Sequence, residues 1–298
     1  QDVLKEDYDI VFVDESHRLA RRKGITSYGS FDEACARLGL DPMISTQLDM
    51  IQKKSKYSVL VYDGCQTVKA SDLTPEQFQH SLDLRTRTVH RVILQTQMRC
   101  EGGQSYLEYL DRIFQVSQDD PLMVENYDFK IWDDPNRMIE NIRNKDLNLS
   151  LCRVVAGYSW RWQSKGCETI AQAIREGLED IELDGRKYVW NMSNQEWILR
   201  EGAVNEIGCV HTTQGYDLNY VAVIFGHEID YDDESDSIVI DRSKFFDSKV
   251  KDGVDYDTLK QYIVNSYKVM MTRGIKGCYV YACNPRLQNY LKRFIAKA

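Results

Sequence analysis

Two acidic residues, Asp14 and Glu15, are the first side chains along the chain that could do chemistry together. They follow residues 8–13, YDIVFV, an apolar and β-branched run that is too short for a buried helix and therefore predicts a strand. In open α/β sheets, ligands bind at the carboxyl ends of the strands. A carboxylate pair at that edge can hold a metal ion and activate a water molecule, although Asp and Glu also end strands without such a role.

Four later stretches also place polar or charged side chains beside a predicted strand. In chain order they are Asp63-Gly64-Cys65-Gln66 after residues 57–62, Gln97-Met98-Arg99 after residues 91–96, Val210-His211-Thr212-Thr213-Gln214-Gly215 before residues 220–225, and Val269-Met270-Met271-Thr272-Arg273 before residues 278–283. Carboxylates can hold a metal ion and activate a water molecule, and arginines can bind an anion such as phosphate.

Together with Asp14-Glu15-Ser16-His17, these stretches resemble the motifs of superfamily 1 helicases in the same order, with Asp14-Glu15-Ser16-His17 as the Walker B box, or motif II. Over nearly its whole length, the chain resembles the Schlafen-group-3-like DNA/RNA helicase domain. The resemblance implies an α/β fold of two RecA-like P-loop NTPase lobes with parallel sheets. It also implies that ATP and Mg²⁺ are the cofactors and that single-stranded DNA or RNA is the partner.

The resemblance gives roles to four residues of the first half. Asp14 resembles the family's aspartate that coordinates Mg²⁺ through water, and Glu15 resembles its catalytic base. Gln66 resembles the glutamine of motif III that senses the γ-phosphate and couples it to the nucleic-acid site. Asp63, which begins the same motif, is expected to bind the nucleotide. On its own, a strand that ends in DGCQ would indicate only a turn.

Arg99, in the stretch that resembles motif IV, and Arg273 are the candidates for the arginines that contact the γ-phosphate when the domains close. A guanidinium offers a planar fork that a phosphate can accept twice. Gly215 and Thr272, in the stretches that resemble motifs V and VI, are expected to bind the nucleotide. A lone arginine would more often form a surface salt bridge.

Contacts with nucleic acid are expected from motif V and from two tryptophans. Short polar donors can contact the phosphate backbone without reading sequence. The tryptophans could stack on unpaired bases, although an aromatic pair is more often packed in a core or a domain interface. For the histidine of motif V alone, a structural role is favoured. The residues expected to contact nucleic acid are His211, Thr212, Thr213, Gln214, Trp160 and Trp162.

The chain departs from the family pattern in three respects. Tyr62 stands where the family usually has a glycine before the aspartate of motif III, and Met98 stands where an aromatic residue often stacks on adenine. The phosphate-binding sequence G-x-x-x-x-G-K-[ST] does not occur in the chain. In the family that loop lies upstream of motif II. We therefore expect that the chain begins after it, that the missing N-terminal part carries it, and that this chain alone hydrolyses ATP poorly.

Short apolar runs alternate with helical patterns in both halves of the chain, which predicts parallel sheets with helices on both sides. Turn-rich breaks within residues 117–150 indicate a junction. We expect a first RecA-like lobe at residues 1–149, incomplete at its N-terminus and carrying motifs II to IV. A second lobe with motifs V and VI is expected at residues 150–298.

Local patterns predict where particular elements begin. Ser30 has the pattern of a helix cap, and Thr74 and Pro75 are suited to the cap and first position of another helix. The acidic run at residues 228–236, EIDYDDESD, is typical of a solvated loop.

Composition is that of a large globular enzyme core, with 298 residues, 43% hydrophobic and 28% charged. No apolar run is long enough to cross a membrane, and the N-terminus has no signal pattern and looks like a cut end. Eight cysteines form no CxxC pair, so we expect reduced, mostly buried thiols in a cytoplasmic protein. The net charge of −8 argues against a strongly electrostatic nucleic-acid binder, although basic clusters could still line a groove.

We expect the parent protein to be an ATP-dependent translocase or helicase, in which closure on ATP moves one lobe along a single strand. Two other classes of function stay open. One is a nucleic-acid-binding or sensor module that keeps the architecture without turnover. The other is a metal nuclease that uses Asp14 and Glu15, which would leave the later motifs unexplained.

Overall fold

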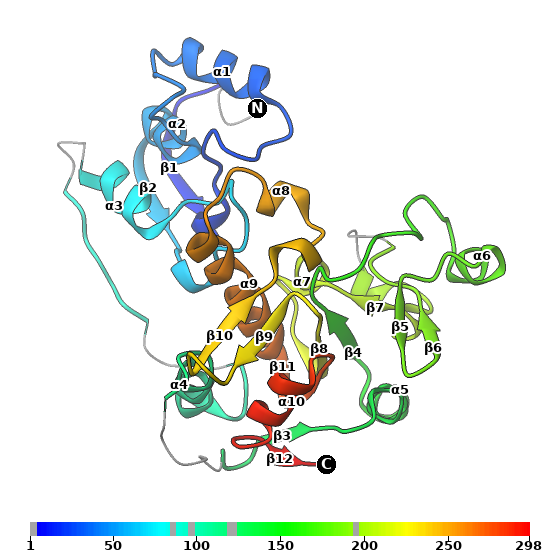
Figure 1. Cartoon of the computed structure of the whole chain (residues 1–298). Coiled ribbons are helices and arrows are strands. Elements are labelled where there is room, and N and C mark those ends of the chain that lie inside the picture. The colour runs from blue at the N-terminus through cyan, green and yellow to red at the C-terminus, as the bar shows by residue number, and fades with distance from the viewer. Residues whose placement is uncertain (1–4, 84–87, 95–98, 118–123, 193–196) are drawn as a thin grey trace. The chain divides into compact units, whose positions relative to one another are not determined.

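The structure is a computed structural model, and it describes residues 5–83, 88–94, 99–117, 124–192 and 197–298. Its elements are labelled in Figure 1. It is divided into two units, of which the first contains residues 1–93 and 248–265 and the second contains residues 94–247 and 266–298. The lobe boundary that the sequence predicts between residues 149 and 150 stays a prediction.

A six-stranded parallel sheet forms the centre of the second unit, in the order β12-β3-β11-β8-β4-β7. In chain order its strands are β3 (Asp128–Ile131), β4 (Cys152–Ala156), β7 (Ile207–Gly208), β8 (Leu218–Phe225), β11 (Gly274–Ala282) and β12 (Ala296–Lys297). The residues of β4 are all buried, as a parallel sheet with both faces covered requires. This sheet and its flanking helices confirm the predicted class, a RecA-like α/β fold.

Helices and two hairpins surround this sheet. The helices are α4 (Gly103–Phe114), α5 (Pro135–Leu149), α6 (Ile170–Glu176), α7 (Val210–Thr213), α10 (Pro285–Leu291) and the end of α9 (Tyr256–Met271), which begins in the first unit. Asp134 caps α5, because its Oδ1 accepts the backbone N–H groups of Asn136 and Arg137 at 2.9 and 3.0 Å. The hairpins are β5 (Ile181–Leu183) with β6 (Arg186–Tyr188), and β9 (Ile229–Asp232) with β10 (Ser237–Ile240).

The first unit contains a two-stranded parallel sheet of β1 (Tyr8–Val13) and β2 (Ser55–Leu60), in which Tyr8 is opposite Ser55. The predicted bounds of β1 are confirmed, whereas β2 begins and ends two residues before the predicted strand 57–62. The helices beside it are α1 (Tyr28–Arg37), α2 (Gln47–Lys54), α3 (Pro75–Asp83), α8 (Ser248–Lys251) and the beginning of α9.

The strand predicted at residues 91–96 is absent from residues 91–94, the part of that range that the structure describes. Residues 91–94 have no strand conformation, and residues 95–98 lie outside the described part of the chain. Val92, Ile93 and Leu94 are each more than 80% exposed. A β-branched run becomes a strand only when a neighbouring strand pairs with it, and within the described ranges none pairs with these residues.

The described helices include none long and apolar enough to cross a membrane. All eight cysteines are free, and Cys35, Cys100, Cys152, Cys209 and Cys278 are buried.

Ser27, and not Ser30, caps the first helix. The helix begins at Tyr28, and Ser27 Oγ accepts the backbone N–H of Ser30 at 3.3 Å. The predicted cap was therefore placed three residues too late, because Ser30 is the residue whose N–H the cap binds. The prediction for the third helix is confirmed, since Pro75 begins α3 and Thr74 Oγ1 accepts the N–H of Gln77 at 3.3 Å.

The acidic run at 228–236 is a solvated loop only in part. Residues 229–232 form β9, in which Ile229 and Tyr231 are buried and the two aspartates alternate with them. Residues 233–236 form the exposed turn of the hairpin. Glu228 is fully buried, and its Oε1 accepts the Tyr267 hydroxyl proton at 2.5 Å. Counting charges missed the period-two alternation that identifies a strand with one buried face.

Ser27→Ala should loosen the first turn of α1, because the Ser30 N–H loses its side-chain acceptor, at a cost of about 1 kcal/mol. Hydrogen exchange measured by mass spectrometry should show faster exchange of the first amides of α1. Ser30→Ala leaves the cap in place and should change that exchange less. A larger effect for Ser30→Ala would mean that the cap is at Ser30.

Glu228→Gln should make stability less dependent on pH. Burial raises the pKa of Glu228 above its ordinary value of 4.5. The stability that a raised pKa contributes is complete below the ordinary value and is lost as pH rises through the raised one. Glutamine keeps an oxygen for Tyr267 but cannot ionise. Urea unfolding should therefore show that the free energy of unfolding falls less between pH 5 and pH 8 in the variant than in the unchanged protein.

Glu234→Gln is the matched control, because Glu234 lies in the exposed turn of the same hairpin. An equal loss of stability in the unchanged protein and in Glu228→Gln would show that Glu228 does not ionise in this pH range.

Candidate functional site

Asp14 and Glu15 stand where β1 ends and the chain turns. Glu15 has a φ of 51°, in the left-handed region that a residue with a side chain rarely adopts. Asp14 Oδ1 accepts the Glu15 N–H at 2.9 Å, and the Ser16 N–H donates to the Val61 carbonyl at 2.7 Å. Asp14 is exposed. Its second carboxylate oxygen is therefore available to the water shell of a Mg²⁺ ion, which usually keeps several waters.

The imidazole of His17 lies against the carboxylate of Glu15. Its Nε2 lies 3.0 Å from Glu15 Oε2, and its side chain is buried while that of Glu15 is 36% exposed. Burial lowers the pKa of His17, although the charge of Glu15 opposes this. The buried imidazole is thus in close contact with a carboxylate that still reaches solvent, without a hydrogen bond between the two atoms. Motif patterns assign His17 no separate role; its place two residues after Glu15 was the available signal.

Asp63 and Gln66 lie at the same edge of the first unit's sheet as Asp14, because β1 and β2 are parallel neighbours. Asp63 Oδ1 accepts the Cys65 N–H at 3.0 Å, and its Oδ2 accepts the Gln66 amide at 2.9 Å. Asp63 and Gln66 thus contact each other in a tight turn. Within the described ranges, no group of three or more His, Cys, Asp or Glu side chains gathers as a metal site.

Tyr62, which replaces the family's usual glycine, anchors this turn by packing. Its ring stacks on Phe78 with a centroid distance of 4.0 Å, and its hydroxyl donates to the Leu73 carbonyl at 3.2 Å. The side chain therefore attaches the end of β2 to α3. A glycine at this position would allow the backbone of the turn more conformations, whereas the tyrosine side chain restricts the turn through its contacts with Phe78 and Leu73.

Arg99 pairs with Asp217, two residues after Gly215, so the candidate for motif IV lies beside motif V. The side chain of Arg99 is 32% exposed. Gln97 and Met98, the other residues of its stretch, lie outside the described residues.

The two threonines of motif V hold the backbone of α7. Thr212 Oγ1 accepts the Cys209 N–H and donates to the Cys209 carbonyl, both at 2.8 Å. Thr213 Oγ1 also donates to the Cys209 carbonyl, at 3.2 Å. Both threonines are buried, and so is Gln214. Contact of these side chains with nucleic acid stays a prediction; here they shape the turn that ends at Gly215, whose φ is 91°.

His211 lies on the side of α7 that faces Tyr158 and Asp247. Its Nε2 is 3.8 Å from Asp247 Oδ2, and its ring centroid is 5.6 Å from that of Tyr158. The histidine is thus part of a packed polar group, as its structural interpretation anticipates.

Arg273 is 2% exposed and extends along the end of α9. Its Nε donates to the Val269 carbonyl at 3.0 Å, and Thr272 Oγ1 donates to the same carbonyl at 3.0 Å. The Arg273 carbonyl accepts the N–H of Leu218, which follows motif V by three residues. Motifs V and VI are therefore adjacent.

Trp160 and Trp162 pack against the core of the second unit. The ring of Trp160 is 6.3 Å from that of His227, and the ring of Trp162 is 6.5 Å from that of Trp190, edge to face. This geometry favours packing over base stacking, and stacking stays a prediction.

The candidate residues form two groups, each within one unit. Asp14, Glu15, Asp63 and Gln66 belong to the first unit. The second unit contains Arg99, Gly215, Thr272, Arg273 and the residues expected to contact nucleic acid, which are His211, Thr212, Thr213, Gln214, Trp160 and Trp162.

Comparison with known proteins gives two matches. The model of the family described as Schlafen group 3, DNA/RNA helicase domain, matches residues 2–284. The uncharacterized protein YPL245W of Saccharomyces cerevisiae (strain ATCC 204508 / S288c) is 30% identical over 319 aligned positions. That alignment covers 96% of this chain but 64% of the yeast protein, so the chain spans less than two thirds of its relative. The family description indicates a helicase-type role on nucleic acid. Because the family match extends over nearly all of the sequence, the chain belongs to the Schlafen group 3 DNA/RNA helicase domain family.

Proposed function

We propose that the chain is the core of an ATP-dependent translocase or helicase that moves along single-stranded DNA or RNA. The contact between His17 and Glu15, 3.0 Å apart at the end of β1, carries this proposal. A carboxylate that packs against a buried imidazole and still reaches solvent suits a base that orients an attacking water. A strand that merely ends in acidic residues has no need of such a partner.

Mg²⁺ and ATP are proposed to bind beside this pair. Asp14 would hold the ion through water, and Asp63 and Gln66 would face the nucleotide from the neighbouring turn. The ion would neutralise charge on the phosphates. Glu15 would accept a proton from the attacking water, with His17 packed against its carboxylate.

Arg99 and Arg273 are proposed to contact the γ-phosphate. Arg99 is paired with Asp217 and partly exposed, so it would exchange a carboxylate for a phosphate. Arg273 would have to exchange the Val269 carbonyl for a phosphate. Phosphate is a stronger acceptor than the Val269 carbonyl, because hydrogen bonds between charged groups are stronger than those to a neutral acceptor, whereas Arg99 would exchange one anion for another.

A non-hydrolysing binding or sensor module is the second candidate. The burial of Arg273 and the engagement of the Thr212 and Thr213 hydroxyls with backbone favour it, since these groups are not presented to a ligand here. We propose that this chain alone turns over ATP slowly.

Glu15→Gln should reduce ATP hydrolysis by about 10² to 10⁴, the usual contribution of a general base, while nucleotide binding persists. The measurement is ATP turnover by the longest encoded chain, with and without single-stranded DNA and RNA. Glu33→Gln is the control, because Glu33 is an exposed glutamate on α1 of the same unit.

Turnover that rises with one of the strands and is lost in Glu15→Gln supports the motor and identifies its strand. Strand binding without any turnover would instead support the sensor module. Cleavage of DNA with Mg²⁺ and no ATP, lost in Asp14→Ala, would identify a nuclease.

A further inference from the structure

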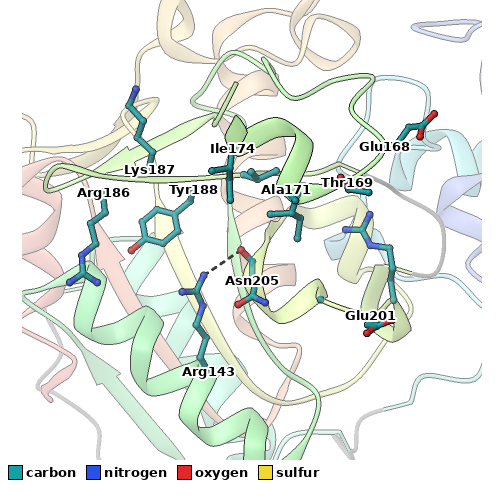
Figure 2. Close-up of a pocket in the computed structure, with 14 residues that line it drawn as sticks. Arg143, Glu168, Thr169, Ala171, Ile174, Arg186, Lys187, Tyr188, Glu201 and Asn205 are labelled. Atoms are coloured by element: carbon teal, nitrogen blue, oxygen red, sulfur yellow. Dashed lines mark hydrogen bonds between the residues drawn. The ribbon is translucent and has the colours of Figure 1, made fainter. Parts of the chain in front are cut away.

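A pocket of about 1060 Å³ lies in the second unit, away from every motif residue (Figure 2). Its walls come from α5, α6, β6 and the segment that ends at Asn205. Small-molecule pockets usually measure about 300 to 1,000 Å³, so this one has room for a ligand the size of a nucleotide. None of its lining residues has a role in the function proposed above.

Arg143 is the most unusual side chain in this pocket. Its Nη2 donates to the Asn205 carbonyl at 3.3 Å, and its guanidinium lies over the Tyr188 ring, 5.8 Å from the centroid. Its Nε is buried and has no hydrogen-bond partner among the described residues. A buried donor without a partner is rare in folded proteins and often marks the place of a ligand or a water.

The other cations of the pocket differ in how they are compensated. Arg186 pairs with Glu140 at 2.5 Å, and Arg200 pairs with Glu206. Across the described ranges, no acidic group lies within ion-pair distance of Arg143 or Lys187. Positive charge therefore remains available on Arg143, while the side chain of Lys187 points away from Arg143 in Figure 2.

The pocket has an acidic side as well. In Figure 2, Arg186, Lys187 and Tyr188 lie on one side, and Glu168 and Glu201 lie on the opposite side. Between them Ile174, which is 55% exposed, offers an apolar surface from α6. A ligand that fits must combine an anion, a flat or apolar body, and hydrogen-bond donors at its far end.

We propose that this pocket binds a nucleoside phosphate, either free or as one nucleotide of a single strand. The phosphate would be bound by Arg143, because a guanidinium forms strong charge-assisted hydrogen bonds with phosphate oxygens. The base would lie against Ile174, and its amino group would donate to Glu168 or Glu201, as carboxylates accept from the amino group of cytosine. This binding needs no ATP hydrolysis. A site for a free nucleotide goes beyond the function proposed above, whereas a site for one nucleotide of a strand rests on that function.

The test measures binding in EDTA and without ATP, so that it stands apart from the test of the motor. Titration calorimetry with AMP, CMP, UMP, adenosine and inorganic phosphate examines the free ligand. Fluorescence anisotropy with a labelled oligothymidylate and a labelled oligoadenylate examines the strand. Lys187→Gln removes one exposed charge, and Arg143→Gln removes the guanidinium.

Arg137→Gln on α5 and Arg175→Gln on α6 are the matched controls, because both arginines are exposed on the same helices and neither lines the pocket. Thermal unfolding checks that each variant is folded.

Binding of AMP or CMP that falls about tenfold in Arg143→Gln, and not in Lys187→Gln or the controls, supports a site for the free nucleotide. The same loss of affinity, seen with the oligonucleotides but not with AMP or CMP, supports a site for one nucleotide of a single strand. Amino-bearing bases should bind more tightly than uracil, and Glu168→Gln with Glu201→Gln should reduce that preference. Absence of binding, equal binding in all variants, or binding of an acidic peptide in place of every nucleotide probe overturns the proposal.

Discussion

The parallel pairing of β1 and β2 continues beyond the ends of both strands, and the site in the first unit depends on it. The Val61 N–H donates to the Val13 carbonyl at 2.9 Å, and the Ser16 N–H then donates back to the Val61 carbonyl at 2.7 Å. These two bonds fix where motifs II and III begin relative to each other. A slip of one residue would turn Asp14 and Asp63 to opposite faces, because side chains alternate along a strand.

In the second unit, the edge at the carboxyl ends of the strands is partly filled by side chains of the unit itself. After β4 and β8 the chain continues through Gly157 and Gly226. The space beside Gly157 is filled by Tyr267 and Glu228, and the space beside Gly226 by Glu228 and Ser159. A Cβ added at Gly157 would collide with the Tyr267 hydroxyl and with Glu228 Oε1. The chain thus closes the centre of this edge with its own side chains. Candidate ligand residues are left at motifs V and VI, which adjoin through Arg273 and Leu218.

Sequence patterns were sufficient where one local rule decides the structure. The apolar run 8–13 gave β1 its bounds, and proline fixed the start of α3, because few alternatives compete with either signal. Ser27 and Ser30 are equally good caps by residue type, so only the turn that the chain adopts distinguishes them. The partner of Glu15 and the burial of Glu228 depend on side-chain packing, which local patterns do not contain.

The spacing of residues along the sequence could not have revealed the pocket around Arg143. Its walls come from residues 143, 168–174, 186–189 and 200–205, which tertiary folding alone brings together. No residue in these segments forms a recognisable motif, and a lone arginine on a helix is normally read as a solvated charge.

The buried position of Arg273 is compatible with the proposed motor. Its guanidinium is buried but its Nε is bonded to a neutral carbonyl at the end of α9. The carbonyls at a helix C-terminus carry partial negative charge and lack intrahelical partners, so they stabilise a cation modestly. A phosphate carries full charges and would attract the same guanidinium more strongly, by about the difference between a neutral and a charge-assisted hydrogen bond. Burial and the bond to the Val269 carbonyl therefore hold Arg273 at the end of α9, and its transfer to a phosphate stays a proposal.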